Sequence, residues 1–173
     1  MRPLKPIWYH KLGFENNPFS IKPAIVNDEL IGQANVLEEV NQLIIDGGIG
    51  LIIGDYGVGK TTLLKGLIKR HAGMRRVIYF SCNRLNGPLD LDRLLHERFG
   101  IIGKMLKLKS KNLILLLDEA KNLTKEDTKR VMQYYKKGYF KTVLFVGHKH
   151  EEFALPQDLK RIHVQKLSKD DAV

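Results

Sequence analysis

A glycine-rich octapeptide in the first third of the chain constrains the fold more than any other feature. Residues 54–61 of the 173-residue sequence read GDYGVGKT and satisfy the pattern G-x-x-x-x-G-K-[ST] at every fixed position. Glycines let successive backbone N–H groups point inward, and the N-terminus of a following helix adds partial positive charge. A short aliphatic run, Leu51 to Ile53, precedes the octapeptide, and apolar residues at helical spacing follow it. The octapeptide therefore predicts a phosphate-binding loop between a strand and a helix.

The side chains of this loop predict ATP and Mg²⁺ as its ligands. Lys60 can reach the β- and γ-phosphates, the Thr61 hydroxyl can ligate Mg²⁺, and Thr62 can contact an inner phosphate. The other positions expected to surround the phosphates are Gly54, Asp55, Tyr56, Gly57, Val58 and Gly59. The alternative is a glycine turn that happens to carry a lysine. The strand before the loop and the helix after it argue against that alternative.

Two acidic residues follow the most aliphatic segment of the chain. Asn112 to Leu117 predicts a buried strand, which places Asp118 and Glu119 at its carboxyl end, where α/β sheets bind their ligands. We expect Asp118 to hold Mg²⁺ opposite Thr61, and Glu119 to orient or deprotonate the water that attacks the γ-phosphate. The alternative is an acidic helix start after a strand. A small-molecule kinase often lacks the second carboxylate, so the pair favours ATP hydrolysis over phosphoryl transfer to a metabolite.

Strand and helix patterns alternate along the chain. This order predicts an α/β fold of the P-loop NTPase kind, a three-layer sandwich around a central, mainly parallel five-stranded sheet. Thr124 and Asp127 have the spacing of a helix N-cap and its N3 partner. The expected helices are Gln33–Asp46, Lys60–His71, Leu89–Phe99 and Thr124–Lys137, and the expected strands are Leu51–Ile53, Val77–Ser81, Asn112–Leu117, Thr142–Val146 and Ile162–Lys166.

Basic residues exceed acidic ones by 29 to 19, which gives a net charge of +10. Such an excess favours polyanionic partners, with nucleic acid first and an acidic membrane surface second. Lysines and aromatic residues alternate over residues 121–141, where they could follow phosphates and stack on bases, and residues 104–111 carry further lysines. The alternative is a solvated basic surface, because the core-facing stripe of that helix is expected to be Thr128, Val131, Met132 and Tyr135. Charge alone does not decide between the two.

The sequence also predicts where the chain resides. No aliphatic run is long enough to span a membrane, and no apolar segment of a signal peptide follows Met1 to His10. The single cysteine, Cys82, cannot form an internal disulfide and is expected to be a small buried residue rather than a nucleophile. These features favour the cytoplasm. Aromatic residues and prolines in residues 1–32 predict an arm packed on a core that spans residues 33–166.

Four segments together resemble the AAA+ ATPases, and within them the ExeA-type group that includes transposition helpers. Origin-recognition initiator ATPases are more distant relatives. Leu12–Phe19 is similar to the N-terminal opening of the group, and Leu30–Gln33 is similar to the box before its first helix. Asp118–Leu123 is close to its motif DEAQNL, and Val143–His148 is close to its motif vLvGQ. The resemblance covers nearly the whole chain, and the order and separation of the segments make it specific.

This resemblance implies further site residues. Ile31 would line the adenine pocket. His148 would take the polar sensor position beyond the fourth strand, where glutamine is usual, and could bond the γ-phosphate or the attacking water; a surface histidine is the alternative. Arg161, before the last strand, would reach the γ-phosphate of a neighbouring subunit as an arginine finger; a plain surface arginine is the alternative. Residues 167–173 resemble the start of a helical lid, so we expect a truncated piece of a longer protein; a chain that works without a lid is the alternative.

Three functions follow from these observations. The first is an AAA+ ATPase that acts on DNA in replication, recombination or transposition, with ATP bound between the subunits of a homo-oligomer. The second is an ATPase that remodels or positions a protein partner, as secretion-linked members of the group do, without direct DNA binding. The third is a small-molecule kinase, which Glu119 and the lack of a visible acceptor site disfavour.

Overall fold

The computed structural model describes residues 33–72, 77–83, 88–97, 113–156 and 159–166. Five of the described segments form one sheet of parallel strands, in the order β2-β3-β4-β1-β5. This arrangement confirms the expected α/β fold. The strands are β1 Gly48–Gly54, β2 Val77–Ser81, β3 Leu113–Asp118, β4 Phe140–His148 and β5 Lys160–Val164.

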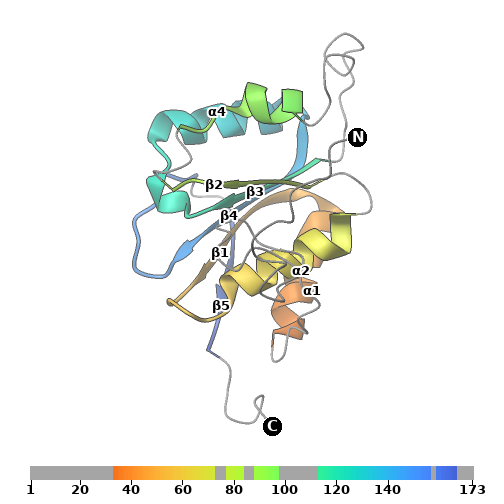
Figure 1. Cartoon of the computed structure of the whole chain (residues 1–173), viewed down its shortest axis with the longest axis vertical. Helices are drawn as coiled ribbons and strands as arrows, with labels where there is room; N and C mark the ends of the chain where they lie inside the picture. Colours follow the sequence, from red (N-terminus) through yellow and green to blue (C-terminus); the bar gives the residue numbers. More distant parts are fainter. Residues whose placement is uncertain (1–32, 73–76, 84–87, 98–112, 157–158, 167–173) are drawn as a thin grey trace, which may run out of the picture.

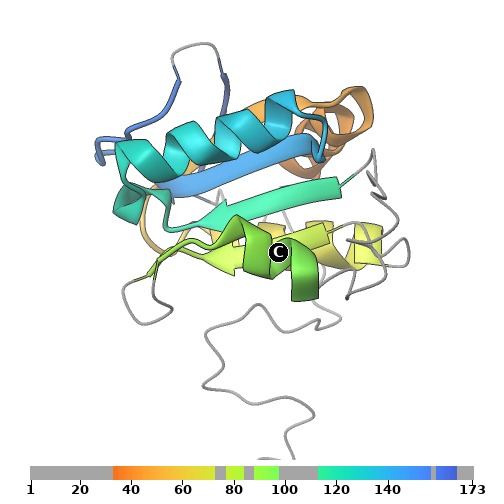
Figure 2. The same ribbon diagram turned by 90° about the horizontal axis from the view of Figure 1, so that it is seen from above.

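Helices cover both faces of this sheet (Figure 1). Helices α1, Ala34–Asp46, and α2, Lys60–Ala72, lie on one face. The opposite face carries α4, Lys125–Lys136, and a helical segment at residues 91–97 (Figure 2). The described residues therefore form a three-layer sandwich. No described helix is both long enough and apolar enough to cross a membrane.

Two buried clusters, one on each face, hold the layers together. Leu63 and Leu67 of α2 pack with Ile52 on one side, and Val131 of α4 packs with Leu115 on the other. The first five residues of β3 are all buried, because alternate side chains of an interior strand enter opposite clusters. Its aliphatic run thus reflects burial on both faces.

Helix ends follow local chemistry that the sequence predicts. Thr124 caps α4: its hydroxyl accepts a hydrogen bond from the Asp127 N–H at 3.0 Å, and the Asp127 carboxylate accepts one from the Thr124 N–H at 3.1 Å. Gly47 ends α1 with φ 86°, a left-handed value that favours glycine. An added Cβ there would also lie 3.1 Å from the carbonyl oxygen of Lys141.

Several expected boundaries are corrected by the structure. Strands β1 and β4 extend beyond the expected Leu51–Ile53 and Thr142–Val146, because backbone pairing continues at both ends of each expected range. Strand β5 begins at Lys160 rather than Ile162, so Arg161 lies inside the last strand and not before it. The arm at 1–32, the lysines of 104–111 and the lid start at 167–173 lie outside the described residues, and those expectations stay predictions.

Candidate active site

The phosphate-binding loop connects β1 to α2 at the carboxyl edge of the sheet. Gly57 and Gly59 have φ values of 75° and 92°, in the left-handed region that glycine adopts without strain. An added Cβ at Gly59 would lie 2.7 Å from the Nε2 atom of Gln33, whose amide donates to the Val58 carbonyl. Gln33 is buried, and its Oε1 atom has no hydrogen-bond partner within the described residues. The loop therefore has a glycine-dependent shape and a spare acceptor beside it.

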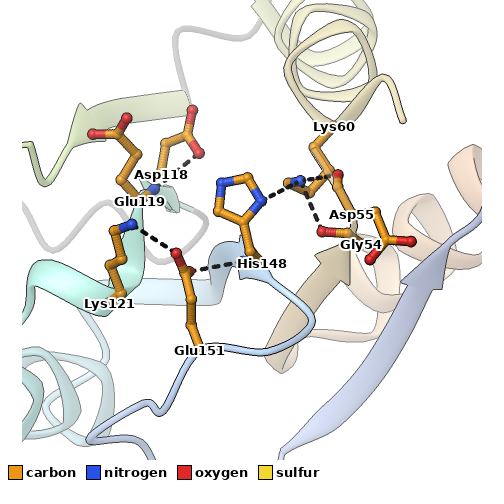
Figure 3. A network of polar contacts seen from close by, with 8 residues as sticks. All are labelled: Gly54, Asp55, Lys60, Asp118, Glu119, Lys121, His148 and Glu151. Atoms are coloured by element: carbon orange, nitrogen blue, oxygen red, sulfur yellow. Dashed lines mark hydrogen bonds and ion pairs between the residues drawn. The ribbon is translucent and has the colours of Figure 1, made fainter. Parts of the chain in front are cut away.

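Lys60 begins α2 and has three hydrogen-bond partners in the structure. Its Nζ atom donates to the carbonyl oxygens of Gly54 at 2.9 Å and Asp55 at 2.7 Å, and it lies 3.1 Å from Nδ1 of His148 (Figure 3). Burial lowers the pKa of Lys60, and the nearby carboxylates of Asp118, Glu151 and Asp55 oppose that shift. An ammonium group thus sits at the mouth of the loop in a partly buried setting.

Asp118 ends β3, and both of its carboxylate oxygens accept hydrogen bonds. The Tyr79 hydroxyl donates to Oδ2 at 3.1 Å, and the Glu119 N–H donates to Oδ1 at 2.9 Å. Burial raises the pKa of Tyr79, and the charge of Asp118 raises it further, so the phenol remains a donor. The carboxylate is therefore held in one orientation on the α2 side of the sheet, where Tyr79 packs.

Glu119 adopts a left-handed backbone with φ 54° and ψ 44°, unlike every other non-glycine residue in the described segments. Such a conformation is disfavoured for residues with a Cβ and is found at functional turns. The Ser81 hydroxyl donates to Oε2 of Glu119 at 3.3 Å. In Figure 3 the Glu119 side chain extends away from Lys60, whereas His148 lies between Asp118 and Lys60. The two carboxylates share one edge of the sheet but point in different directions.

His148 is the last residue of β4 rather than a residue beyond it, and it pairs in register with Gly54. Its imidazole stacks on the Tyr56 ring, with centroids 3.5 Å apart and an interplanar angle of 24°. Burial lowers the pKa of His148, and the Lys60 charge lowers it further. Because Nδ1 faces the donor Lys60, the hydrogen bond assigns the neutral ring proton to Nε2.

Thr61 and Thr62 lie in the first turn of α2, the former exposed and the latter half-buried. Hydroxyl and carboxylate oxygens are hard ligands of the kind that Mg²⁺ prefers, so the donor set of Thr61 and Asp118 fits this ion. Groups of three or more histidine, cysteine, aspartate or glutamate ligands are absent from the described part of the chain.

Three further predictions concern Arg161, Ile31 and Cys82. Arg161 is exposed in β5 and pairs with Leu51, three positions before the end of β1, so it is set back from the loop of its own subunit. Ile31 lies outside the described residues. Cys82 is buried, which raises the pKa of its thiol to about 12. Burial of Cys82 confirms the expected small packing residue.

Sequence reasoning missed four residues of the site. Gln33 belongs to the segment that resembles the box before the first helix, but nothing in the sequence indicates its contact with the phosphate-binding loop. Tyr79 and Ser81 lie two residues apart in β2, so their side chains are on the same face of the sheet. Two hydroxyl groups at this spacing could have indicated hydrogen-bond donors for a neighbouring strand. Glu151 accepts from the His148 N–H at 2.9 Å and pairs with Lys121 at 2.8 Å. No sequence signal indicated Glu151.

Solved structures with a similar fold include one ATPase and two proteins in complex with an adenine nucleotide or its analogue. A Walker-type ATPase of Pyrococcus abyssi aligns with a TM-score of 0.61 and 15% identity, over 88% of this chain and 59% of that one. The replication initiator DnaA, bound to AMPPCP and single-stranded DNA, aligns with a TM-score of 0.52 and 19% identity, over 86% of this chain and 50% of that one. The Hsp104–ADP complex of S. cerevisiae aligns with a TM-score of 0.54 and 17% identity, over 83% of this chain and 23% of that one. At these identities the likeness establishes the fold alone, and this chain spans less than two thirds of each protein.

No curated protein sequence matches the chain. A family match does exist: residues 44–153 match the family described as AAA domain. The matched segment exceeds half of the chain and contains both the phosphate-binding loop and the acidic pair. The chain therefore belongs to the AAA domain family of P-loop ATPases.

Proposed function

We propose that the chain binds Mg²⁺-ATP at the loop of residues 54–61 and hydrolyses it to ADP and phosphate. The observation that carries this proposal is the juxtaposition of Lys60, His148 and Asp118 at one edge of the sheet (Figure 3). The Lys60 ammonium at the N-terminus of α2 and the nearby imidazole suit a triphosphate, and the fixed carboxylate of Asp118 suits its metal ion.

Each residue has a distinct role in this proposal. Backbone N–H groups of the loop and the Lys60 ammonium bind the phosphates, which requires Lys60 to exchange its carbonyl partners for phosphate oxygens. Thr62 contacts an inner phosphate. His148 supplies a hydrogen bond near the γ-phosphate or the attacking water, as the sensor position implies. Gln33, which is buried, is proposed to lie near the adenine, and so is Ile31.

Thr61 and Asp118 would hold the Mg²⁺ ion, which neutralises charge on the β- and γ-phosphate oxygens when bound. The hydrogen bonds from Tyr79 and the Glu119 N–H keep the Asp118 carboxylate oriented for that task. Glu119 is proposed to orient or deprotonate water. In the structure its carboxylate meets Ser81, so it must rotate about its side-chain bonds to act.

DNA is the proposed partner. Net charge of +10 favours a polyanion, and the water-facing side of α4 carries Lys125, Lys129 and Lys136, all exposed. Thr128 and Val131 are buried and Met132 and Tyr135 partly so, which confirms the core-facing stripe and leaves these lysines in solvent. The DnaA structure with a similar fold is bound to single-stranded DNA, which supports the proposal of a DNA partner.

Remodelling of a protein partner is the second candidate, supported by the fold shared with Hsp104. A DNA titration with and without ATP at several salt concentrations separates the two candidates. The DNA proposal predicts binding that weakens steeply with salt, because contacts to phosphates release counterions. Absence of binding, or binding insensitive to salt, would favour the protein partner.

ATP hydrolysis itself is tested by phosphate release from Mg²⁺-ATP with no acceptor present. Release that depends on Mg²⁺ supports an ATPase. Transfer only to an added metabolite would instead indicate a kinase. We further propose membership of the ExeA-type group, a cytoplasmic location and a homo-oligomer in which Arg161 reaches the nucleotide of a neighbour.

A further inference from the structure

Glu151 joins two parts of the active-site edge that are distant in sequence. Its side chain is only 14% exposed, although it lies in the segment that follows β4. Oε2 accepts a hydrogen bond from the His148 N–H at 2.9 Å, and Oε1 forms an ion pair with Nζ of Lys121 at 2.8 Å. Lys121 belongs to η3, the turn Ala120–Asn122 that directly follows the acidic pair. One carboxylate therefore connects the end of β4 to the turn after β3 (Figure 3).

The surroundings of Glu151 hold it in this place. Phe153 packs against Gly147, where an added Cβ would lie 2.4 Å from the ring and 3.2 Å from Oε2 of Glu151. The chain after β4 thus folds back on the strand. Burial opposes ionisation of Glu151, but the Lys121 ammonium and the His148 N–H outweigh it and hold the pKa of Glu151 below its usual value. The carboxylate is charged: Oε2 accepts a hydrogen bond, whereas Oε1 has no hydrogen bond of good geometry within the described residues and is balanced by the Lys121 ammonium alone.

The backbone held by Glu151 is the backbone that carries the sensor side chain. His148 places Nδ1 3.1 Å from Nζ of Lys60, a distance that depends on where the end of β4 lies. We propose that Glu151 is a positioning residue, which fixes the His148 imidazole against Lys60 and ties it to the turn that follows Asp118 and Glu119. This inference rests on the proposed ATPase function and adds to it a link between the sensor strand and the acidic pair.

Electrostatics around His148 give this link a spectroscopic signature. The charged groups that face the imidazole are Lys60, Lys121, Glu151 and Asp118, and the uncharged Tyr56 ring stacks on it. Glu151 and Asp118 favour the protonated imidazole, whereas the two lysines disfavour it. Removing Glu151 and removing Lys121 should therefore move the pKa of His148 in opposite directions.

The first test is an NMR titration of the His148 imidazole in the nucleotide-free chain, with His148→Gln used to assign the signal. Glu151→Ala should lower the pKa of His148, and Lys121→Met should raise it. Glu152→Ala, which alters an exposed neighbour, serves as the matched control and should leave the titration unchanged. Unchanged titration in both Glu151→Ala and Lys121→Met would overturn the proposal. This readout requires no nucleotide, so it remains interpretable if wild-type chain fails to bind ATP.

The second test is a double-mutant cycle on ATP turnover. Glu151→Ala should lower kcat about tenfold with little change in KM, and the same substitution should have no further effect in a His148→Ala background, because coupled residues are not additive. Glu151→Gln keeps an acceptor for the His148 N–H and should recover most of the lost rate. Equal losses in both backgrounds would show a general structural role and overturn the proposal. Thermal unfolding of each variant identifies any that fail to fold.

Discussion

At the scale of single residues, the site is defined by which donors and acceptors are already paired. The three N–H donors of Lys60 face Gly54, Asp55 and His148, and both oxygens of Asp118 accept hydrogen bonds. The Glu119 carboxylate accepts a longer hydrogen bond than those of Asp118, from the Ser81 hydroxyl at 3.3 Å. A carboxylate held by one neutral hydrogen bond can be released at a cost of about 1 kcal/mol. The residue proposed to act on water is therefore the one whose side chain is most easily turned.

Glu119→Gln should keep Mg²⁺-ATP binding and lower turnover by about a hundredfold or more, because the amide cannot accept a proton from water. Binding is measured by calorimetry and turnover by phosphate release, with the exposed Glu126→Gln as a control. Wild-type turnover in Glu119→Gln would remove this residue from its proposed role.

Tyr79→Phe should raise the Mg²⁺ concentration needed for half-maximal ATP binding several-fold. The Tyr79 hydroxyl donates a hydrogen bond to Oδ2 of Asp118, and losing that bond should weaken Mg²⁺ binding by about 1 kcal/mol, because the carboxylate is less well oriented. The ring of the phenylalanine still packs in the cluster on the α2 side of the sheet. Titration of ATP binding against Mg²⁺ measures the change. An unaltered Mg²⁺ requirement, with the fold intact, would contradict the positioning role of Tyr79.

At the scale of helices and strands, local signals predicted most elements and tertiary pairing set the rest. The sequence placed β2 at its observed bounds and α2 and α4 within a residue or two, because apolar spacing and capping are local. The predicted ranges of β1 and β4 were too short, because the residues at the strand ends, among them Gly48, Gly54 and His148, join the sheet only through pairing with neighbouring strands. The contacts of Tyr79 and Ser81 depend on the β2–β3 register, which pairs Ser81 with Asp118 and has no local signal.

The α1–α2 contact predicts how the stability of the fold depends on pH. Nε2 of His71 lies 3.1 Å from Oδ1 of Asn41, and burial, with a further contribution from Arg70, lowers the pKa of His71. The unfolded chain therefore binds this proton more readily, so the free energy of unfolding should fall as pH drops below the usual histidine value near 6.5.

Urea unfolding at pH 7.5 and pH 5 measures that loss. In His71→Gln the loss should be smaller than in wild type, because the titrating group is gone while a donor for Asn41 is kept. The two proteins differ only at residue 71, so the difference in loss isolates His71. Identical losses in the two chains would show that His71 does not contribute.

At the scale of the whole molecule, the two helical layers cover the faces of the sheet and leave its carboxyl edge for the active site. Strand β5 forms one lateral edge of the sheet, and several of its side chains are exposed. Arg161 lies on that lateral edge, away from its own phosphate loop. The proposed role of Arg161 is therefore to reach the nucleotide of another subunit.

Arg161→Ala should weaken any assembly that a non-hydrolysable ATP analogue induces, because a desolvated cation at the γ-phosphate is lost. Light scattering against protein concentration reports the assembly, and Lys166→Ala, an exposed residue just after β5, is the comparison. Equal assembly of Arg161→Ala and wild type would leave this arginine as a surface residue.

The most direct test of the site is calorimetric titration of Mg²⁺-ATP into the wild-type chain and into Lys60→Ala, with Lys65→Ala of the same helix as a control. Wild type and Lys65→Ala should bind with similar affinity, and Lys60→Ala should bind at least about a hundredfold more weakly, a difference of roughly 2.8 kcal/mol. No heat of binding in wild type, or equal affinity in Lys60→Ala, would contradict a nucleotide site built on the ammonium of Lys60 and the carboxylate of Asp118.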